Sequence, residues 1–329
     1  MSKRVLITGA TGFVGYHLIE TALAAGLEVY AAVRKSSDVS HLKAFPISYI
    51  DLNYGSVESL TAQLDEHQFN YIIHAAGITK AKAAAEYNLV NAGYTKNLAL
   101  AATMTKYKLD KFVFVSSLAA LGPLKDLSML IQDDTEGAPV TSYGASKLLA
   151  EQHLKEITDL PLVVIRPTAV YGPREKDLFI LFKTISQGLE PYIGSFKQNL
   201  TFIYVKDLAA VIISALTSPV TGKSYNITDG AIYDRYALGQ FARKALNKRT
   251  FKFHLPIFIV SAMATVMDLL YRNSKNAPTL NPEKMAELTA VNWACNIDSA
   301  RTDLGFEPVF DLEKGLVQTM DWYKANKWI

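Results

Sequence analysis

Thr8-Gly9-Ala10-Thr11-Gly12-Phe13-Val14-Gly15 is the stretch that decides the fold of this chain. It follows the apolar run 5–7 and precedes a helical pattern that extends over about residues 14–25. Gly9 permits a tight turn, Gly12 lets the backbone approach a pyrophosphate, and Gly15 permits close packing of the helix on the strand. The free N–H groups at the start of such a helix attract phosphate oxygens. A glycine-rich turn between a first strand and a first helix therefore predicts dinucleotide binding.

Short apolar runs alternate with helical patterns in the first half of the chain. Strands are predicted at 5–7, 27–33, 47–52, 71–74, 112–115 and 162–165, and further helices at 56–67, 86–106 and 142–157. Apolar strands without polar alternation are typical of a parallel sheet covered on both faces. We therefore predict an α/β fold with a doubly wound parallel sheet of the Rossmann type, and a dinucleotide-binding domain over residues 1–172.

The alternation loosens after residue 172, where prolines and glycines separate shorter elements. We predict a smaller, mostly helical substrate domain over 173–329, with a return to the sheet within about 201–232, at 202–216 and 224–227. Residues 255–267 are apolar apart from Ser261 and Thr265. This stretch is shorter than the ~20 residues that a membrane span requires. A buried helix is the prediction, and contact with a membrane interface is the alternative.

The composition excludes several classes of protein. Half of the 329 residues are hydrophobic and 20% are charged, as in a globular chain with a full core. The net charge is only +3, without a block of like charge, so we expect no nucleic-acid partner. The single cysteine, Cys295, excludes an internal disulfide, and we expect no metal site because the histidines are scattered. The apolar run at the amino terminus ends at residue 8, so we expect no signal peptide and a cytoplasmic protein.

Tyr143 and Lys147 are four residues apart on a predicted helix and so lie on one face of it. A free tyrosine has a pKa near ~10, and a neighbouring ammonium group is expected to lower it. Tyr143 could then exchange a proton with a carbinol oxygen while hydride is transferred. A serine hydroxyl at the end of the strand 112–115 could bind the same oxygen. Both Ser117 and Ser116 are candidates for that role.

The chain resembles the extended branch of the short-chain dehydrogenase/reductase superfamily, which includes the NAD-dependent epimerase/dehydratase family. Within this branch, the chain looks most like members similar to dihydroflavonol reductase and 3β-hydroxysteroid dehydrogenase. The resemblance covers nearly the whole chain. It rests on the Gly-x-x-Gly-x-x-Gly spacing and on these further motifs: Asp51-Leu52, His74-Ala75-Ala76-Gly77, Asn91, Ser116-Ser117, 143–147, 166–173 and Leu304-Gly305-Phe306.

The resemblance implies a catalytic relay of Ser117, Tyr143 and Lys147, and it favours Ser117 over Ser116. Lys147 would also hold the nicotinamide ribose. Relatives commonly dimerise through the helices that here span about 86–106 and 142–157, so we expect a homodimer. The cofactor-binding residues implied are Gly9, Thr11, Gly12, Phe13, Val14, Gly15, Asp51, Leu52, Ala75, Ala76, Gly77, Asn91, Tyr143, Lys147, Pro167, Thr168 and Val170.

The end of the second predicted strand bears on the choice of nicotinamide cofactor. Relatives that prefer NAD have an acidic residue there, which binds the ribose hydroxyls. Here the matching position is Val33, and Arg34 and Lys35 follow. An arginine can bind a 2′-phosphate through two hydrogen bonds. We therefore expect NADP(H), with NAD(H) as the alternative if Arg34 and Lys35 are only solvated loop charges.

Three functions remain open for a chain that acts on a small molecule. The first is reduction or oxidation of an apolar ketone, aldehyde or alcohol, and the second is epimerisation or dehydration of a nucleotide sugar with a tightly held cofactor. The third is dinucleotide binding by a non-catalytic interaction protein. Nucleotide-sugar relatives have an arginine at the position of Leu200, and this favours the first function. Residues 255–267 could form an apolar wall of the substrate site, although four arginines could still bind a phosphate: Arg174, Arg235, Arg243 and Arg272.

Overall fold

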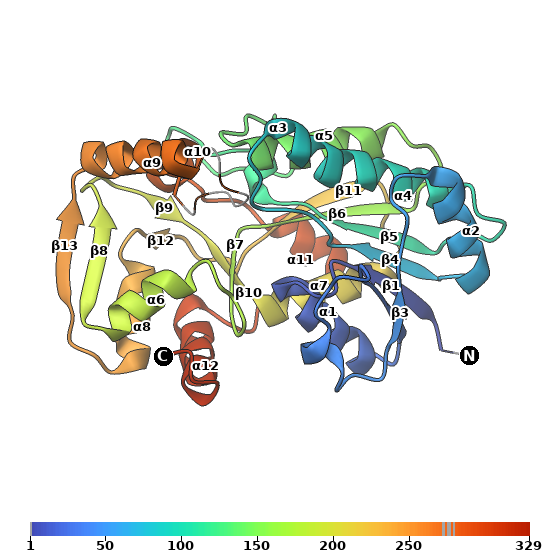
Figure 1. Cartoon of the computed structure of the whole chain (residues 1–329), viewed down its shortest axis with the longest axis horizontal. Helices are drawn as coiled ribbons and strands as arrows, with labels where there is room; N and C mark the ends of the chain where they lie inside the picture. Colours follow the sequence, from blue (N-terminus) through green and yellow to red (C-terminus); the bar gives the residue numbers. More distant parts are fainter. Residues whose placement is uncertain (1, 272–273, 275–277, 279) are drawn as a thin grey trace.

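Seven parallel strands form the centre of the computed structural model, which describes residues 2–271, 274, 278 and 280–329 (Figure 1). Their order is β11-β6-β5-β4-β1-β2-β3, so the chain proceeds outward from β1 in both directions. The predicted doubly wound sheet is confirmed. The strands are β1 (Arg4–Thr8), β2 (Glu28–Ala32), β3 (Ser48–Ile50), β4 (Tyr71–His74), β5 (Lys111–Val115), β6 (Leu162–Pro167) and β11 (Lys223–Ile227).

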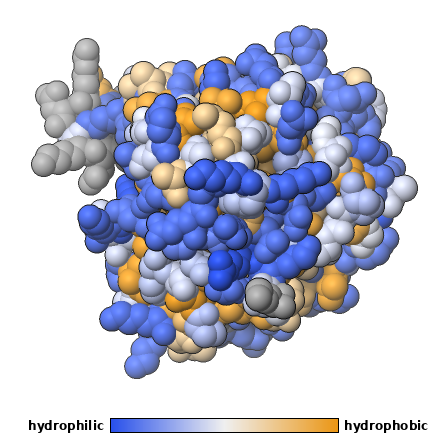
Figure 2. Space-filling view, turned by 90° about the vertical axis from the view of Figure 1, so that its right-hand side faces the viewer, coloured by the Kyte–Doolittle hydropathy of each residue, from blue (hydrophilic) through white to orange (hydrophobic). Residues whose placement is uncertain are grey.

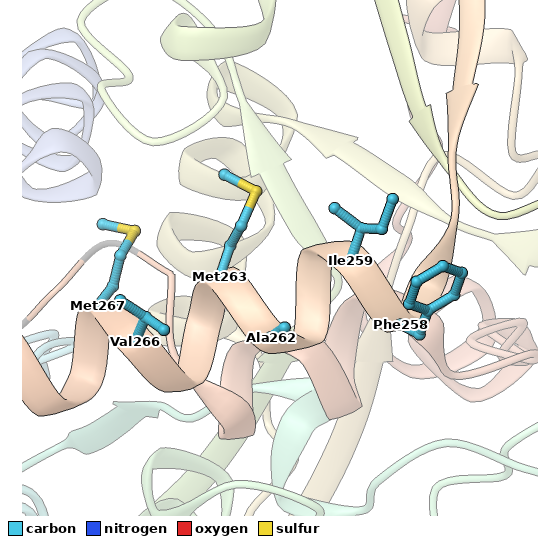
Figure 3. Close-up of a pocket in the computed structure, with 6 residues that line it drawn as sticks. All are labelled: Phe258, Ile259, Ala262, Met263, Val266 and Met267. Carbon is cyan, nitrogen blue, oxygen red and sulfur yellow. The ribbon is translucent and has the colours of Figure 1, made fainter.

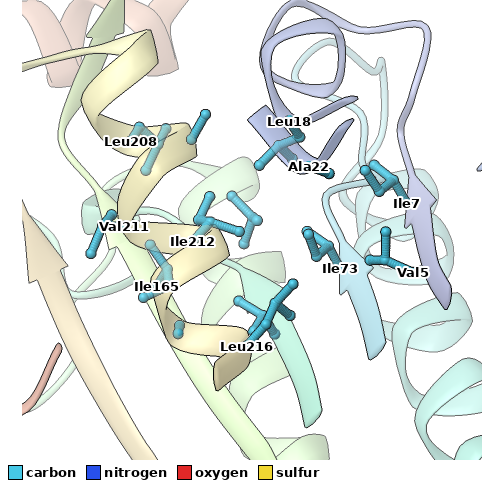
Figure 4. Close-up of a cluster of buried hydrophobic side chains, with 14 of the residues drawn as sticks. Val5, Ile7, Leu18, Ala22, Ile73, Ile165, Leu208, Val211, Ile212 and Leu216 are labelled. Atoms are coloured by element: carbon cyan, nitrogen blue, oxygen red, sulfur yellow. The ribbon is translucent and has the colours of Figure 1, made fainter. Parts of the chain in front are cut away.

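Helices cover both faces of this sheet. On one face lie α1 (Phe13–Ala24), α7 (Val205–Thr217) and α11 (Asp298–Leu304), and on the other α2 (Val57–His67), α4 (Tyr94–Thr103) and α5 (Ser142–Lys155). Figure 4 shows side chains of α1 and α7 directed toward strand residues such as Val5 and Ile73. Leu6, between Val5 and Ile7, packs on the opposite face. Burial on both faces explains why the inner strands are apolar along most of their length.

The predicted helix at 86–106 is not continuous, and that prediction was wrong in detail. The chain forms α3 (Ala84–Tyr87), a π-helical segment η2 (Asn88–Gly93) and then α4. The wide turn contains Asn91, which is fully buried. Its side-chain amide donates to the Ile78 carbonyl at 3.0 Å and to Ser146 Oγ at 2.9 Å, and its oxygen accepts from the Ile78 N–H at 2.8 Å. Wide turns of this kind are frequent at functional sites.

A second lobe lies at the end of the molecule opposite β3 (Figure 1). Its strands pair in twos, as β10–β7, β12–β9 and β13–β8. Residues 202–216 add no strand to the large sheet, because 202–204 pair with β7 and α7 covers the sheet instead. The remaining elements are β7 (Ala169–Tyr171), β8 (Leu189–Ile193), β9 (Asn199–Leu200), β10 (Phe202–Tyr204), β12 (Tyr233–Asp234), β13 (Phe251–Leu255), α6 (Phe179–Ser186), α8 (Ala237–Leu246), α9 (Ile257–Tyr271), α10 (Pro282–Thr289), α12 (Leu312–Ala325) and the short helices η1 (Ser40–Leu42) and η3 (Leu118–Ala120).

The apolar stretch 255–267 does form a helix, α9, but the prediction that it is buried was wrong. Only Val260 and Ala264 of α9 are buried, in a small cluster with Met285 of α10. Phe258 and Leu270 are each 73% exposed. The helix packs on α10 and on the end of the β8–β13 pair, and no other element of the described chain covers its outer side. Figure 2 shows the opposite end of the molecule, where hydrophilic side chains cover most of the face.

Within the described residues, no helix is both long enough and apolar enough to cross a membrane.

Candidate active site

The glycine-rich turn forms a close-packed loop between β1 and α1. Gly9 has a φ of +70°, and a Cβ there would lie 2.6 Å from the Ala75 carbonyl oxygen. A Cβ at Gly15 would lie 2.2 Å from the Gly9 carbonyl oxygen. Gly12 begins α1 without a capping side chain, and the first turn of α1 has no acidic residue. The N–H groups at this helix start therefore fit a pyrophosphate.

A buried hydrogen-bond chain links this loop to the neighbouring strand. Thr8 and His74 lie opposite each other in β1 and β4, and Thr8 Oγ1 is 2.8 Å from His74 Nδ1. Thr8 Oγ1 also accepts from the Ala76 N–H, and His74 Nε2 is 2.8 Å from Thr95 Oγ1. Burial lowers the pKa of His74 to about 3, so the imidazole is neutral. A proton on Nε2 satisfies every one of these bonds, with Thr8 donating to Nδ1.

Sequence reasoning assigned no role to Thr8 or Thr95 in this chain of hydrogen bonds. The available signal was the position of Thr8 and His74 at the ends of adjacent parallel strands, which place both side chains at one sheet edge.

Two of the predicted relay residues meet at the start of α5. Thr141 caps this helix by accepting from the Gly144 N–H at 3.0 Å. A Cβ at Gly144 would lie 2.3 Å from the Ala119 carbonyl oxygen, so only glycine allows α5 to approach η3 this closely. The approach brings the side chains of Tyr143 and Ser117 close enough to interact.

Of the two candidate serines, only Ser117 is in contact with Tyr143. Ser116 is buried, and its hydroxyl donates to Glu151 at 2.5 Å. Glu151 also forms a buried ion pair with Arg166. Ser116 is therefore engaged in holding α5 on the sheet, whereas the partly exposed Ser117 faces the tyrosine hydroxyl.

The electrostatics of the relay differ from the expectation for an isolated Tyr–Lys pair. Burial raises the pKa of Tyr143 to about 12, although the Ser117 hydrogen bond opposes this rise. The expected lowering by Lys147 was thus wrong for the groups of this chain. Lys147 Nζ instead donates to the Val115 carbonyl at 2.9 Å, and burial lowers the pKa of Lys147 to about 8 against the opposing effect of Glu151.

The other predicted cofactor-binding residues follow the carboxyl ends of adjacent strands. At β4, a Cβ on Gly77 would lie 3.0 Å from Asn91 Oδ1 and 3.4 Å from Lys147 Nζ, so these three residues converge. At β6, Thr168 Oγ1 is buried without a hydrogen-bond partner among the described residues, and it suits a polar group such as a carboxamide. Thr11, Phe13 and Val14 lie on the glycine-rich turn, Asp51 and Leu52 follow β3, Ala75 and Ala76 follow β4, and Pro167 and Val170 lie at the end of β6 and in β7.

Comparison with known proteins identifies the family. The family model described as "NAD dependent epimerase/dehydratase family" matches residues 5–228. The chain belongs to this family. It is a nicotinamide-dependent enzyme of the extended short-chain dehydrogenase/reductase type, as the resemblance implied.

Relatives within this superfamily have different named activities. Ceramide reductase of Caulobacter vibrioides is 26% identical over 328 residues, which cover 99% of this chain and 96% of the relative. UDP-glucose 4-epimerase of Vibrio cholerae is 26% identical over 332 residues, which cover 97% and 95%. The crystal structure of UDP-glucuronic acid 4-epimerase from Bacillus cereus in complex with NAD is similar with a TM-score of 0.77 at 22% identity, over 98% of this chain and 99% of that one. The epimerase/dehydratase fold therefore extends over the whole chain.

Arg34 and Lys35, which were predicted to bind the cofactor, follow β2 as exposed side chains. Neither forms an ion pair with a residue that the structure describes, and Val33 is half-buried. The cationic pair is thus available to a ligand at this sheet edge. Over the described part of the chain, no group of three or more His, Cys, Asp or Glu side chains is arranged to hold a metal ion.

Near Tyr143, α10 contacts the start of α5. The Ser142 N–H and hydroxyl both donate to Glu283, at 2.9 and 2.5 Å. Tyr87 lies beside Tyr143, with ring centroids 6.4 Å apart, and its hydroxyl donates to the Thr79 carbonyl at 3.2 Å. Sequence reasoning missed Glu283 and Tyr87. Glu283 is 141 residues from Ser142, and no pattern in the sequence links the two.

The Gly9→Ala substitution is expected to weaken binding of the nicotinamide cofactor by about tenfold or more, since even ~1.4 kcal/mol of distortion has that effect. The added methyl would displace Ala75 and with it the loop that receives the pyrophosphate. Titration of cofactor binding by fluorescence measures the effect. Gly26→Ala is the matched control, because Gly26 also has a positive φ, +76°, but has no atom within 4 Å of an added Cβ. Equal cofactor affinity in the two variants would contradict the assignment.

Proposed function

We propose that this chain is an NADP(H)-preferring reductase or dehydrogenase that interconverts a carbonyl group and an alcohol on an apolar substrate. The observation that carries the proposal is the pair Ser117 and Tyr143 at the end of β5, combined with arginines on the substrate side that already have partners within the chain.

The relay residues suit reduction of a carbonyl. When bound, the nicotinamide cofactor supplies or accepts the hydride. Tyr143 has a pKa raised to about 12 and is protonated at neutral pH, so its hydroxyl can donate a proton to the substrate oxygen. Ser117 can donate a hydrogen bond to the same oxygen. Lys147, beside Gly77 and Asn91, would hold the ribose.

The arginines argue against a nucleotide-sugar substrate, because a buried diphosphate requires cationic partners. Arg235 is buried and donates to the carbonyls of Phe196 and Ile193. Arg174 stacks 3.9 Å from the centroid of the Tyr16 ring. Arg243 lies 4.0 Å from Glu190, and Arg272 is outside the described residues. Leu200, in β9, offers no donor side chain at all.

Similarity to known proteins supports two substrate classes. The relative named ceramide reductase spans nearly the whole chain and supports an apolar substrate. The equally similar UDP-glucose 4-epimerase supports a second candidate function, epimerisation or dehydration of a nucleotide sugar without net redox change.

We also propose a homodimer that uses the side of η2, α4 and α5. Leu89 in η2 and Met104 at the end of α4 are 55% and 60% exposed, and apolar side chains of this kind pack across helical interfaces.

Substrate class is tested with a panel of long-chain ketones and of UDP, GDP and dTDP sugars. We expect net NADPH consumption, followed by its absorbance, with an apolar ketone, because Tyr143 can donate a proton to a carbonyl oxygen, whereas Arg174, Arg235 and Arg243 already contact other groups of the chain. Calorimetry should detect no binding of the sugar nucleotides. Micromolar binding of one of them, with inversion or dehydration and no net cofactor consumption, would establish the second candidate instead.

Tyr143→Phe is expected to lower kcat by about 10²-fold or more, which is the scale of positioned acid–base groups. Cofactor affinity should change little, because the glycine-rich turn is untouched. Ser117→Ala should also lower kcat, whereas its matched control Ser116→Ala should mainly lower the midpoint of urea unfolding. Near-normal turnover by Tyr143→Phe would refute the relay.

Arg34→Leu is expected to raise the KM for NADPH about tenfold or more and to leave the KM for NADH unchanged, because hydrogen bonds to charged groups contribute about 1.5–3 kcal/mol. Steady-state kinetics with both cofactors measure the ratio. Lys43→Leu, at another exposed lysine of the same region, is the control. A wild-type enzyme that strongly prefers NADH would show that Arg34 does not select the cofactor.

A further inference from the structure

Exposed apolar side chains are concentrated in one part of the second lobe. In the described chain, nine of the twenty large hydrophobic side chains that are substantially exposed lie within residues 251–271. Phe251 is 69% exposed, Phe258 73% and Leu270 73%. Such a concentration is uncommon on a globular protein surface and marks a binding surface.

The β8–β13 pair contributes one apolar face. Its register places Phe251 opposite Leu189, and Leu255 opposite Ile193. The pair between them, Phe253 and Pro191, is also apolar. Because side chains alternate along a strand, these three pairs share one face, and Glu190 points to the other, where it is buried. The outer face of β8–β13 is therefore entirely apolar.

At the Ile193–Leu255 end of this face, α9 begins directly after Pro256 and packs on it through Val260 and Ala264, with its outer side uncovered. Six apolar side chains of α9 line an open hollow of about 490 Å³. Figure 3 shows Ile259, Met263 and Met267 aligned along one side of the helix, with Phe258 and Val266 beside them. We call the outer face of β8–β13 and the outer side of α9 together the apolar surface.

The charge around the apolar surface is strongly asymmetric. Residues 235–267 contain six lysines and arginines and no acidic residue, and the exposed Asp268 of α9 follows directly, whereas the whole chain has a net charge of only +3. The rest of the chain therefore has a net charge of −3. Lys248 and Arg249 are exposed, and neither forms an ion pair with a described residue, whereas Lys252 points to the opposite face of β13, over the Tyr236 ring. Lys248 and Arg249 immediately precede Phe251, at the edge of the apolar surface.

We propose that the apolar surface docks onto a membrane surface rich in anionic phospholipids. Exposed Phe and Leu side chains of a surface helix insert at the boundary between headgroups and acyl chains, and neighbouring Lys and Arg side chains bind anionic headgroups. A second copy of the chain fits less well, because a two-fold interface here would bring together two regions in which basic residues outnumber the single acidic residue of α9, Asp268.

The apolar surface is also connected to the active site. Val260 and Ala264 of α9 pack with Met285 of α10, and Glu283 of α10 binds Ser142 next to Tyr143. A docked enzyme could receive an apolar substrate from the bilayer close to Tyr143. That step rests on the proposed function, whereas the docking itself does not.

Vesicle flotation of the full chain, without substrate or cofactor, tests the docking. We expect binding to vesicles of phosphatidylcholine with phosphatidylglycerol to be about tenfold or more tighter than to phosphatidylcholine alone, because each basic side chain near the surface contributes. The triple variant Phe258→Gln/Leu269→Gln/Leu270→Gln should lose about tenfold or more of the binding to anionic vesicles. Lys248→Gln/Arg249→Gln should remove most of the preference for anionic lipid.

The matched control is Met129→Gln/Val309→Gln/Val317→Gln, which changes three exposed apolar side chains outside the apolar surface and should bind as the wild type does. Circular dichroism and cofactor titration confirm that each variant is folded. Docking is refuted if the wild type does not float with anionic vesicles or if the α9 variant floats equally well. It is also refuted if light scattering shows that the α9 substitutions only separate two copies of the chain. None of these outcomes depends on turnover. A failure of docking is therefore distinct from a failure of the proposed reaction, because reduction of a short soluble ketone would still be measurable without a membrane.

Discussion

One buried chain of hydrogen bonds, from Thr8 through His74 and Thr95 to Asn91, holds the active-site edge of the sheet together. Its first member fixes the loop after β4, and its last fixes the π-helical turn and, through Ser146, the catalytic helix. Four segments that are distant in sequence are therefore joined by buried, hydrogen-bonded side chains. Because each buried donor or acceptor would be left unpaired without its neighbour, the arrangement is expected to be rigid.

The sheet was predictable because strands covered on both faces are apolar along most of their length. Few other structures produce short apolar runs that alternate with helical patterns. The glycine-rich turn was predictable because Gly9 and Gly15 meet backbone atoms at distances that exclude any side chain. The interruption at Asn91 was not, since the local sequence favours a helix and only the partners Ile78 and Ser146 require the wide turn. The choice between Ser116 and Ser117 likewise depends on Glu151, which lies 35 residues beyond Ser116.

The misjudged helix α9 illustrates a different limit. An apolar composition predicts that a helix is shielded from water, but it does not identify the surface that shields it. In this chain α10 and the β8–β13 pair cover one side of α9. The other side is also apolar, and no part of the described chain covers it. The raised pKa of Tyr143 was missed for a related reason, because sequence spacing places Lys147 on the same helix face but does not show that its ammonium is directed to the Val115 carbonyl.

The pKa order of the two relay groups has a consequence for the catalytic cycle. At neutral pH the phenol of Tyr143 and the ammonium of Lys147 both hold their protons. In the proposed reduction the phenol releases one proton to the product, and the ammonium, as the stronger acid of the two, is the favoured source for its replacement. Lys147 is buried and Tyr143 is half-buried, so water can reach the tyrosine more readily than the ammonium. In the proposed reduction the pair would then act as a small proton reservoir that must be refilled once in every turnover.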